Sequence, residues 1–288
     1  MANQNCPRST QQAALLLLYN AKRLRKGDDG WQRRGNGTQA AVIDSAHFSE
    51  VYGKPRVKSI GPKLIPFLNT VCIYFILWLP SSEPSWFSAL IKCLPILSLG
   101  IFLLAYSVSI GAMNSYSKRI LLGLLFSAGG DVCLIWPQFF LHGMVMFGIA
   151  HLLYITAFGM RPLKLKIFLV FALLGGTLYF IMHPYLQEPF LYTVGIYTAL
   201  ICIMGWRALA RVKLSSYGWS WTRAYSAIGA ITFMVSDCTL AVDRFCMPLP
   251  YARAIVMGTY YTAQMLIALS IIDTSTDYGD DNLLWKKK

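Results

Sequence analysis

The chain has 288 residues, of which 56% are hydrophobic and only 14% are charged. A soluble domain usually carries about 25% charged residues, so the charged residues are too few for a surface in water. The composition excludes a cytosolic globule, a disordered chain, a collagen and a coiled coil, and it predicts an all-α polytopic membrane protein. The net charge of +13 is scattered over loops and tails. This is typical of the cytoplasmic ends of membrane helices, and we expect no nucleic-acid partner.

The first part of the chain, residues 1–58, differs from the rest because it is polar and basic, with lysines and arginines clustered between Lys22 and Arg34. Its apolar run Ala13–Tyr19 is short and no small-residue cleavage site follows it, so a signal peptide is not expected. We predict a basic, disordered extension whose role stays open. Residues 59–273 are predicted to form the membrane domain, and residues 274–288 a cytosolic tail.

Eight apolar segments follow the extension, and prolines between them separate one segment from the next. Each is long enough to cross a membrane as a helix. We predict transmembrane helices over Leu64–Pro80, Ser88–Ile110, Ile120–Trp136, Phe139–Gly159, Ile167–Met182, Phe190–Leu209, Tyr225–Val242 and Ala252–Ile272.

The loops between these segments differ in charge on alternate sides of the membrane. One set carries nine basic residues: Lys118, Arg119, Arg161, Lys164, Lys166, Arg207, Arg211, Lys213 and Arg223. The other set carries two basic residues together with three acidic ones: Arg244, Arg253, Glu83, Glu188 and Asp243. Because positively charged loops stay in the cytosol, both termini are predicted to be cytosolic.

Two carboxylates lie well inside predicted helices, where an unpaired charge is costly. Asp131 and Asp237 both stand in the pattern small–Asp–x–x–Leu. Asp131 lies 12 residues after Arg119 and Asp237 lies 14 after Arg223, so at about 1.5 Å per residue their depths differ by about 3 Å. Matching depth in equivalent helices predicts two parallel four-helix repeats, with the carboxylates meeting near the repeat axis. The alternative, that each Asp is a structural group bonded across a helix interface, stays open.

Further polar side chains recur within the predicted helices, and several share a helix face by their spacing. They are candidates for binding the substrate or supporting the carboxylates: His151, Tyr154, Ser127, Ser236, Tyr260, Tyr261 and Gln264. His151 is expected to lie deeper than Asp131, and therefore either to act from behind the carboxylates or to line a cavity without touching the reacting bond. No histidine or cysteine spacing indicates a metal site, and no Walker, Rossmann or G-x-S-x-G motif occurs. We therefore expect neither a metal nor a cofactor.

Taken together, these motifs resemble the YhhN-like lysoplasmalogenase family, and in particular its animal transmembrane members. Each motif is weak alone, but the combination is fairly specific and covers about residues 58–272. The resemblance rests on Ser127–Leu134, Phe147–Tyr154, Ser236–Leu240, Thr259–Leu266, Gly61–Leu64 and Leu77–Ser82.

The resemblance implies an eight-helix hydrolase of the endoplasmic reticulum membrane, with residues 59–273 as its catalytic domain. Such an enzyme cleaves the vinyl ether bond of lysoplasmalogens, the 1-alkenyl glycerophosphocholines and glycerophosphoethanolamines. The products are a fatty aldehyde and the glycerophospho-base. The paired aspartates proposed as catalytic in this family fall on Asp131 and Asp237.

Two carboxyl groups suit this reaction. Hydrolysis of a vinyl ether begins when an acid protonates the carbon β to the ether oxygen, and water then adds to the resulting oxocarbenium ion. One carboxylic acid must hold a proton while one carboxylate stabilises the cation and activates water, as in glycoside hydrolysis. Burial favours the neutral form of a carboxyl, and two adjacent carboxylates tend to share one proton. Which aspartate is the acid stays open.

The expected substrate is a single-chain lysophospholipid that enters from the lipid bilayer. Its phosphate needs Arg or Lys, and its ammonium needs a carboxylate or an aromatic face. Asp243, Arg244 and Arg253 lie at the membrane face nearest the two carboxylates and are headgroup candidates, with ordinary interfacial charges as the alternative. The preference for choline or ethanolamine and the oligomeric state stay open, and a homodimer is compatible with the sequence.

Two other classes of protein stay open as alternatives. Eight helices, an apparent repeat and intramembrane carboxylates also describe a proton-coupled transporter, and a non-enzymatic lipid-binding protein is the other. An intramembrane aspartyl protease is disfavoured, because its G-x-G-D motif needs glycine where Ala128 stands.

Overall fold

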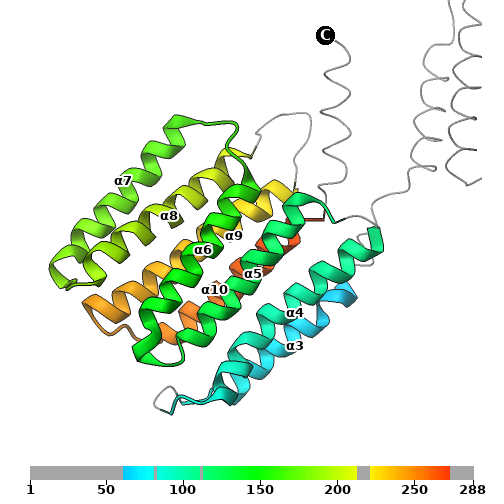
Figure 1. Ribbon diagram of the computed structural model, residues 1–288, viewed down its shortest axis with the longest axis horizontal. Helices are drawn as coiled ribbons and strands as arrows, with labels where there is room; N and C mark the ends of the chain where they lie inside the picture. The colour runs from blue at the N-terminus through cyan, green and yellow to red at the C-terminus, as the bar shows by residue number, and fades with distance from the viewer. Residues whose placement is uncertain (1–60, 81–82, 111–112, 213–220, 273–288) are drawn as a thin grey trace, which may run out of the picture. The chain divides into compact units, whose positions relative to one another are not determined.

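The computed structural model describes residues 61–80, 83–110, 113–212 and 221–272 (Figure 1). Contacts within the chain separate residues 1–57 from residues 58–288, and all described residues belong to the second unit. The predicted disordered extension at 1–58 and the predicted tail at 274–288 lie outside the described residues.

Each predicted apolar segment is a helix, and the described residues contain no strand. The bounds differ from the predicted ones by a few residues; α5, for example, begins five residues early because the side chain of Asn114 caps it by accepting a hydrogen bond from the backbone N–H of Ser117. The helices are α3 (Gly61–Leu77), α4 (Trp86–Ile110), α5 (Ser115–Cys133), α6 (Phe140–Phe158), α7 (Leu165–Met182), α8 (Phe190–Ala210), α9 (Trp221–Ala241) and α10 (Ala252–Leu269).

Five helical stretches among the described residues are long and apolar enough to cross a membrane: Trp86–Ser109, Pro137–Phe158, Leu165–Tyr185, Phe190–Ala210 and Thr222–Cys246. The other three helices do not meet this test by themselves. α3 has only 17 residues. α5 contains the charged residues Lys118, Arg119 and Asp131, and the apolar character of α10 is reduced by Arg253 and Gln264. The protein is therefore a multi-pass helical membrane protein.

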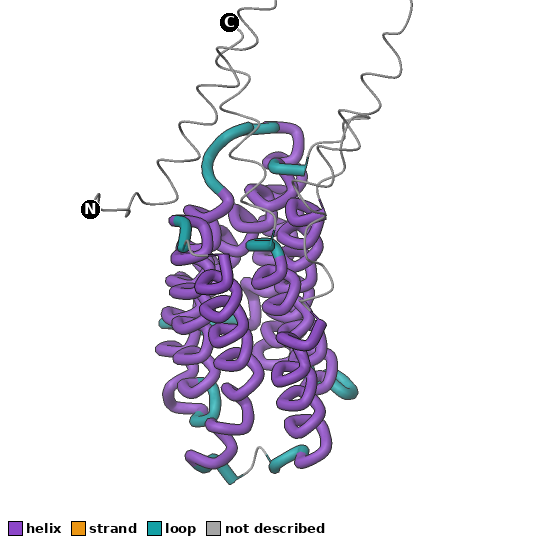
Figure 2. Tube along the Cα trace, turned by 90° about the vertical axis from the view of Figure 1, so that its right-hand side faces the viewer, coloured by secondary structure: helices purple, strands orange, loops and turns teal. Residues whose placement is uncertain are grey.

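Six of the described helices form a closed ring in which each packs on the next, in the order α4, α5, α6, α8, α9, α10 and back to α4. α3 packs outside the ring on α4, and α7 packs outside it on α8, so these two helices form opposite edges (Figure 1). The helices run alongside one another (Figure 2). This ring surrounds the polar groups discussed below.

Glycines let α5 and α6 approach closely. A Cβ on Gly123 would lie 2.2 Å from a ring carbon of Tyr154, and a Cβ on Gly130 would lie 2.7 Å from the ring of Phe147. Side chains do not tolerate such distances, so both aromatic rings occupy space that only glycine leaves free. This packing fixes the height of Asp131, which directly follows Gly130, relative to α6.

Arg207 lies inside α8 and is fully buried, although the sequence placed it in a basic loop. The reason is that its guanidinium holds the connection between α6 and α7. Nε donates to the carbonyl of Gly159 at 2.6 Å, and one terminal N–H group donates to the carbonyl of Pro162 at 2.8 Å. The guanidinium also lies 4.8 Å from the ring centre of Trp206. Arg207 therefore serves the fold at the basic end of the helices.

Candidate functional site

A cavity of about 420 Å³ opens at the end of the ring opposite the basic connections. Its mouth is lined by the connections that follow α3, α5 and α9, through residues such as Pro80, Pro137 and Asp243. Its walls are mostly apolar and include Met144, Met182 and Met234. Among its polar residues are both aspartates that the sequence selected.

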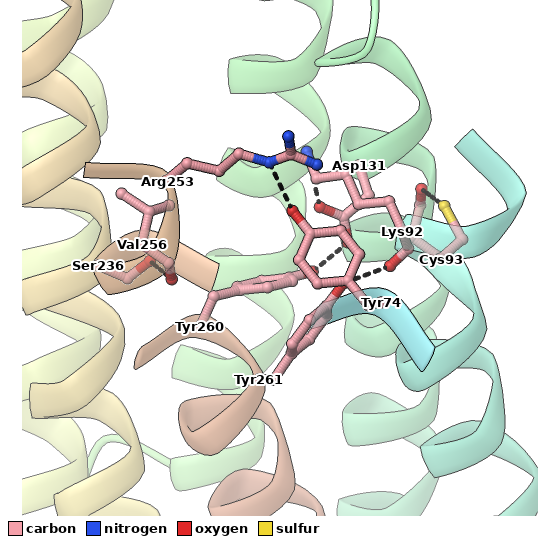
Figure 3. A network of polar contacts seen from close by, with 10 residues as sticks. Tyr74, Lys92, Cys93, Asp131, Ser236, Arg253, Val256, Tyr260 and Tyr261 are labelled. Carbon is pink, nitrogen blue, oxygen red and sulfur yellow. Dashed lines mark hydrogen bonds and ion pairs between the residues drawn. The ribbon is translucent and has the colours of Figure 1, made fainter. Parts of the chain in front are cut away.

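Asp131 is almost completely buried, and each of its carboxylate oxygens faces a donor. Oδ1 lies 3.4 Å from the ammonium of Lys92 on α4, and Oδ2 accepts a hydrogen bond of 2.6 Å from the hydroxyl of Tyr260 on α10. Figure 3 shows these contacts between three helices. The ammonium of Lys92 offsets the free-energy cost of burying the carboxylate, because a buried charge without a partner of opposite charge is strongly destabilising.

The backbone of Lys92 is held by a second tyrosine. The hydroxyl of Tyr261 donates to the carbonyl of Lys92 at 2.8 Å (Figure 3). Pro95 follows within one turn of α4 and interrupts the regular helical hydrogen bonds there. Adjacent tyrosines on α10 thus bind both members of the ion pair, Tyr260 the carboxylate and Tyr261 the lysine backbone.

Asp237 on α9 has a different set of partners. Its Oδ2 accepts a hydrogen bond of 2.5 Å from the hydroxyl of Tyr197 on α8. The Nε2 atom of His151 on α6 lies 2.9 Å from the same hydroxyl and 3.5 Å from Oδ2. His151 is fully buried and is not among the cavity-lining residues. The histidine thus supports the second aspartate from behind, and no hydrogen bond joins the two carboxylates within the described ranges.

Each carboxylate is contacted by one helix from its own half of the chain and by one helix from the other half. Asp131 on α5 is bound from α4 and α10, and Asp237 on α9 is bound from α8 and α6. If α3 is counted as following α10, a move of four helices along the chain takes α5 to α9, α4 to α8 and α10 to α6. The helices that contact Asp131 and those that contact Asp237 are therefore equivalent. The ring order repeats in the same way, since α4, α5 and α6 are followed by α8, α9 and α10.

The remaining polar candidates occupy the space behind and between the carboxylates. Tyr154 donates to Oε1 of Gln264 at 2.8 Å, and both side chains are fully buried. Ser127 is buried one turn below Asp131, and its hydroxyl has no hydrogen-bond partner among the described residues. Ser236 lines the cavity and donates to the carbonyl of Val256 at 3.0 Å, which ties α9 to α10.

The three headgroup candidates line the cavity near its mouth, and each has an intramolecular contact. Asp243 lies in a short π-helical turn (Val242–Cys246) and accepts from the backbone N–H of Leu249 at 2.9 Å. Arg244 lies over the ring of Phe140, 5.3 Å from its centre. Arg253 donates to the carbonyl of Leu79 at 2.6 Å and to the hydroxyl of Tyr74 at 3.2 Å.

Sequence reasoning missed two residues that contact the carboxylates, Lys92 and Tyr197. A signal for Lys92 was available, because a lysine inside an apolar segment is as costly as an aspartate there. Tyr197 carried no such signal, since tyrosine is common in membrane helices and its contact arises only when α8 packs on α9. Across the part of the chain that the structure describes, no group of three or more His, Cys, Asp or Glu side chains is arranged to hold a metal ion.

The fold and the cavity define a class: a helical membrane protein with two acidic groups in the walls of one pocket, Asp131 buried and Asp237 partly exposed, each contacted by hydrogen-bond donors. Comparison with known proteins makes the assignment specific. The YhhN family matches residues 87–271, and this chain belongs to that family.

Several relatives are similar over most of their length. Lysoplasmalogenase TMEM86A of Bos taurus is 51% identical over 229 residues, which cover 79% of this chain and 95% of the relative. Lysoplasmalogenase TMEM86A of Homo sapiens is 50% identical over 220 residues, or 76% of this chain and 92% of the relative. Lysoplasmalogenase TMEM86B of Homo sapiens is 42% identical over 209 residues, or 73% and 86%. No solved structure matches the chain.

Proposed function

We propose that this protein is a lysoplasmalogenase, which hydrolyses the vinyl ether bond of 1-alkenyl glycerophosphocholines or glycerophosphoethanolamines. The observation that carries the proposal is the position of Asp131 and Asp237 in the walls of one apolar cavity. The names of the relatives, which share 42–51% of their residues with this chain, support the same activity.

The chemistry needs only the two carboxyl groups and water. One carboxylic acid gives its proton to the β-carbon of the vinyl ether, and the adjacent carbon and the ether oxygen then share a positive charge. The other carboxylate stabilises this oxocarbenium ion, and water adds to it. The hemiacetal formed in this way collapses to a fatty aldehyde and the glycerol hydroxyl. No metal or cofactor enters these steps.

The cavity offers different surroundings for the two ends of a lysophospholipid. The alkenyl chain would lie along apolar walls that include Leu178, Met182 and Met234. The headgroup would lie at the mouth, where Arg244 and Arg253 are candidates for the phosphate and Asp243 for the amine. A phosphate would compete with the contacts that Arg253 already makes to the connection after α3.

We further propose that all eight helices cross the membrane, as two parallel four-helix repeats with both termini in the cytosol. The exchanged partner helices of the two aspartates and the repeated ring order support the repeat. The basic connections at one end support the orientation. We propose the endoplasmic reticulum as the location, as the family resemblance implies.

The direct test is release of aldehyde from a 1-alkenyl lysophosphatidylcholine by the purified protein, followed through NADH consumption by alcohol dehydrogenase. An acyl lysophosphatidylcholine controls for substrate specificity. We expect Asp131→Asn and Asp237→Asn each to lower kcat by about 10²–10⁴-fold. Glu188→Gln, a matched change in an exposed connection, should act as wild type. Transport of the lipid across proteoliposomes without aldehyde would instead indicate a transporter.

A further inference from the structure

We propose that Lys92 is a positioning residue that keeps Asp131 in its ionised form, so that Asp237 is the proton donor of the reaction. This assignment rests on the proposed vinyl ether hydrolysis and names the role of each carboxyl group in it. It follows from the hydrogen-bonding capacity of the groups around each aspartate.

The contacts of Asp131 leave no place for a proton of its own. Lys92 faces one oxygen and Tyr260 donates to the other. An ammonium group has donors and no acceptor, so a proton on Oδ1 would point at another donor. A proton on Oδ2 would break the bond from Tyr260 or reverse it. The ionised carboxylate satisfies both contacts.

Asp237, by contrast, has one carboxyl oxygen that is free to carry a proton. The described contacts of its carboxyl all go to Oδ2, from Tyr197 and His151, and Oδ1 receives no hydrogen bond from the described residues. Its side chain keeps 16% of its surface exposed, compared with 2% for Asp131, and it lines the cavity. A proton on Oδ1 of Asp237 therefore meets no competing donor, and the substrate occupies the cavity that this side chain lines.

With these roles, every proton is accounted for over one turnover. The carboxyl of Asp237 transfers its proton to the β-carbon, where the π electrons form the new C–H bond, and Asp131 stabilises the oxocarbenium ion without taking a proton. Water attacks that ion and gives one proton to the carboxylate of Asp237. In the collapse, Asp237 gives this proton to the glycerol oxygen as the C–O bond breaks and takes the proton of the hemiacetal hydroxyl. The acid is thereby restored.

Other groups also face the two carboxyls and bear on any pH profile. Around Asp131 these are Cys93 on α4, Tyr261 and Arg253 on α10, and Tyr74 on α3 (Figure 3). The thiol of Cys93 donates to the carbonyl of Ala128, and Arg253 is bound to Tyr74. Around Asp237 the further group is the neighbouring Cys238. Among the described residues, the cationic group that lies within 4 Å of the carboxylate of Asp131 is the ammonium of Lys92.

The test is the pH dependence of kcat for Lys92→Met, Lys92→Arg and wild type. Without the ammonium, Asp131 needs a higher pH to ionise, so we expect the acid limb of the profile for Lys92→Met to move up by about 1–3 pH units. Lys92→Arg should keep the wild-type limb. Lys63→Met is the matched control, since Lys63 contacts Ser109 and does not line the cavity.

Each outcome decides the assignment. An unmoved acid limb with a raised KM in Lys92→Met would overturn it and make Lys92 a headgroup ligand. If Lys92→Met does not fold, Tyr260→Phe removes the other donor of Asp131, and an unmoved acid limb in that variant overturns the proposal as well. A wild-type protein that releases no aldehyde would reject the hydrolysis itself, whereas an active wild type with an unmoved variant would reject only the role of Lys92.

Discussion

The hydroxyl of Tyr197 lies 2.5 Å from Oδ2 of Asp237 and donates a hydrogen bond to it across the interface of α8 and α9. The same hydroxyl lies 2.9 Å from Nε2 of His151. Since its own proton goes to the aspartate, the tyrosine oxygen accepts from the histidine. The three side chains thus form one directed chain that orients the carboxyl of Asp237.

We predict that Tyr197→Phe lowers kcat with little change in KM. Asp237 becomes a carboxylate as it gives up its proton, and a hydrogen bond to a charged group contributes about 1.5–3 kcal/mol, which corresponds to a loss of roughly 10–100-fold. Steady-state aldehyde release measures the effect. Tyr179→Phe is the matched control, because the hydroxyl of Tyr179 binds the carbonyl of Leu191 and the residue does not line the cavity. A kcat of Tyr197→Phe within twofold of wild type would exclude a role for this hydroxyl.

We predict that Gly123→Ala lowers the thermal stability of the protein in detergent. The added methyl group would overlap the ring of Tyr154, and overpacking of this kind costs about 1–3 kcal/mol. The midpoint of thermal unfolding is the measurement. Gly176→Ala on α7 is the control, because nothing lies within 4 Å of the added Cβ; there the better helix propensity of alanine should raise stability slightly. Equal effects of the two changes would contradict the packing of α5 on α6.

We predict that Arg207→Met destabilises the connection between α6 and α7. The change removes the donors of the carbonyls of Gly159, which is half-buried, and of Pro162, which is exposed, and an intramolecular hydrogen bond contributes about 0.5–1.5 kcal/mol. Faster proteolytic cleavage near residues 159–164 and a lower unfolding midpoint are expected. Arg161→Met, an exposed arginine in the same connection, should leave both measurements unchanged. Cleavage at the wild-type rate would show that Arg207 does not hold the connection.

We predict opposite accessibility of the two ends of the helices. In sealed vesicles with the cytosolic face outward, a membrane-impermeant maleimide should label Lys118→Cys at once and Glu188→Cys only after permeabilisation. Lys118 is exposed at the basic end, and Glu188 is exposed at the end where the cavity opens. Labelling of the wild-type protein provides the background from its own cysteines. The reverse pattern would invert the proposed orientation.

Sequence patterns predicted the eight α-helices of the described residues but not the contacts between them. Long apolar runs bounded by prolines predict a helix wherever the chain lies in lipid, and each predicted segment is a helix. A carboxylate inside an apolar segment is costly, which is why the sequence indicates Asp131 and Asp237, and both line the cavity. The same argument applied to Lys92 would have found its ion pair. Tyr197 and the role of Arg207 depend on which helices become neighbours, and that information is spread over residues distant in sequence.

The two halves of the chain, α3 to α6 and α7 to α10, each contribute a helix to the aspartate of the other half. This arrangement has a consequence for the origin of the protein. If both halves descend from one four-helix unit, neither unit could have completed a site alone, because one of the two partner helices of each aspartate comes from the other half. An ancestral chain would have needed a second copy of itself, with two identical acidic groups about a twofold axis. Gene duplication and fusion would have freed the copies to diverge, so that Lys92 on α4 contacts Asp131 where Tyr197, on the equivalent helix α8, contacts Asp237.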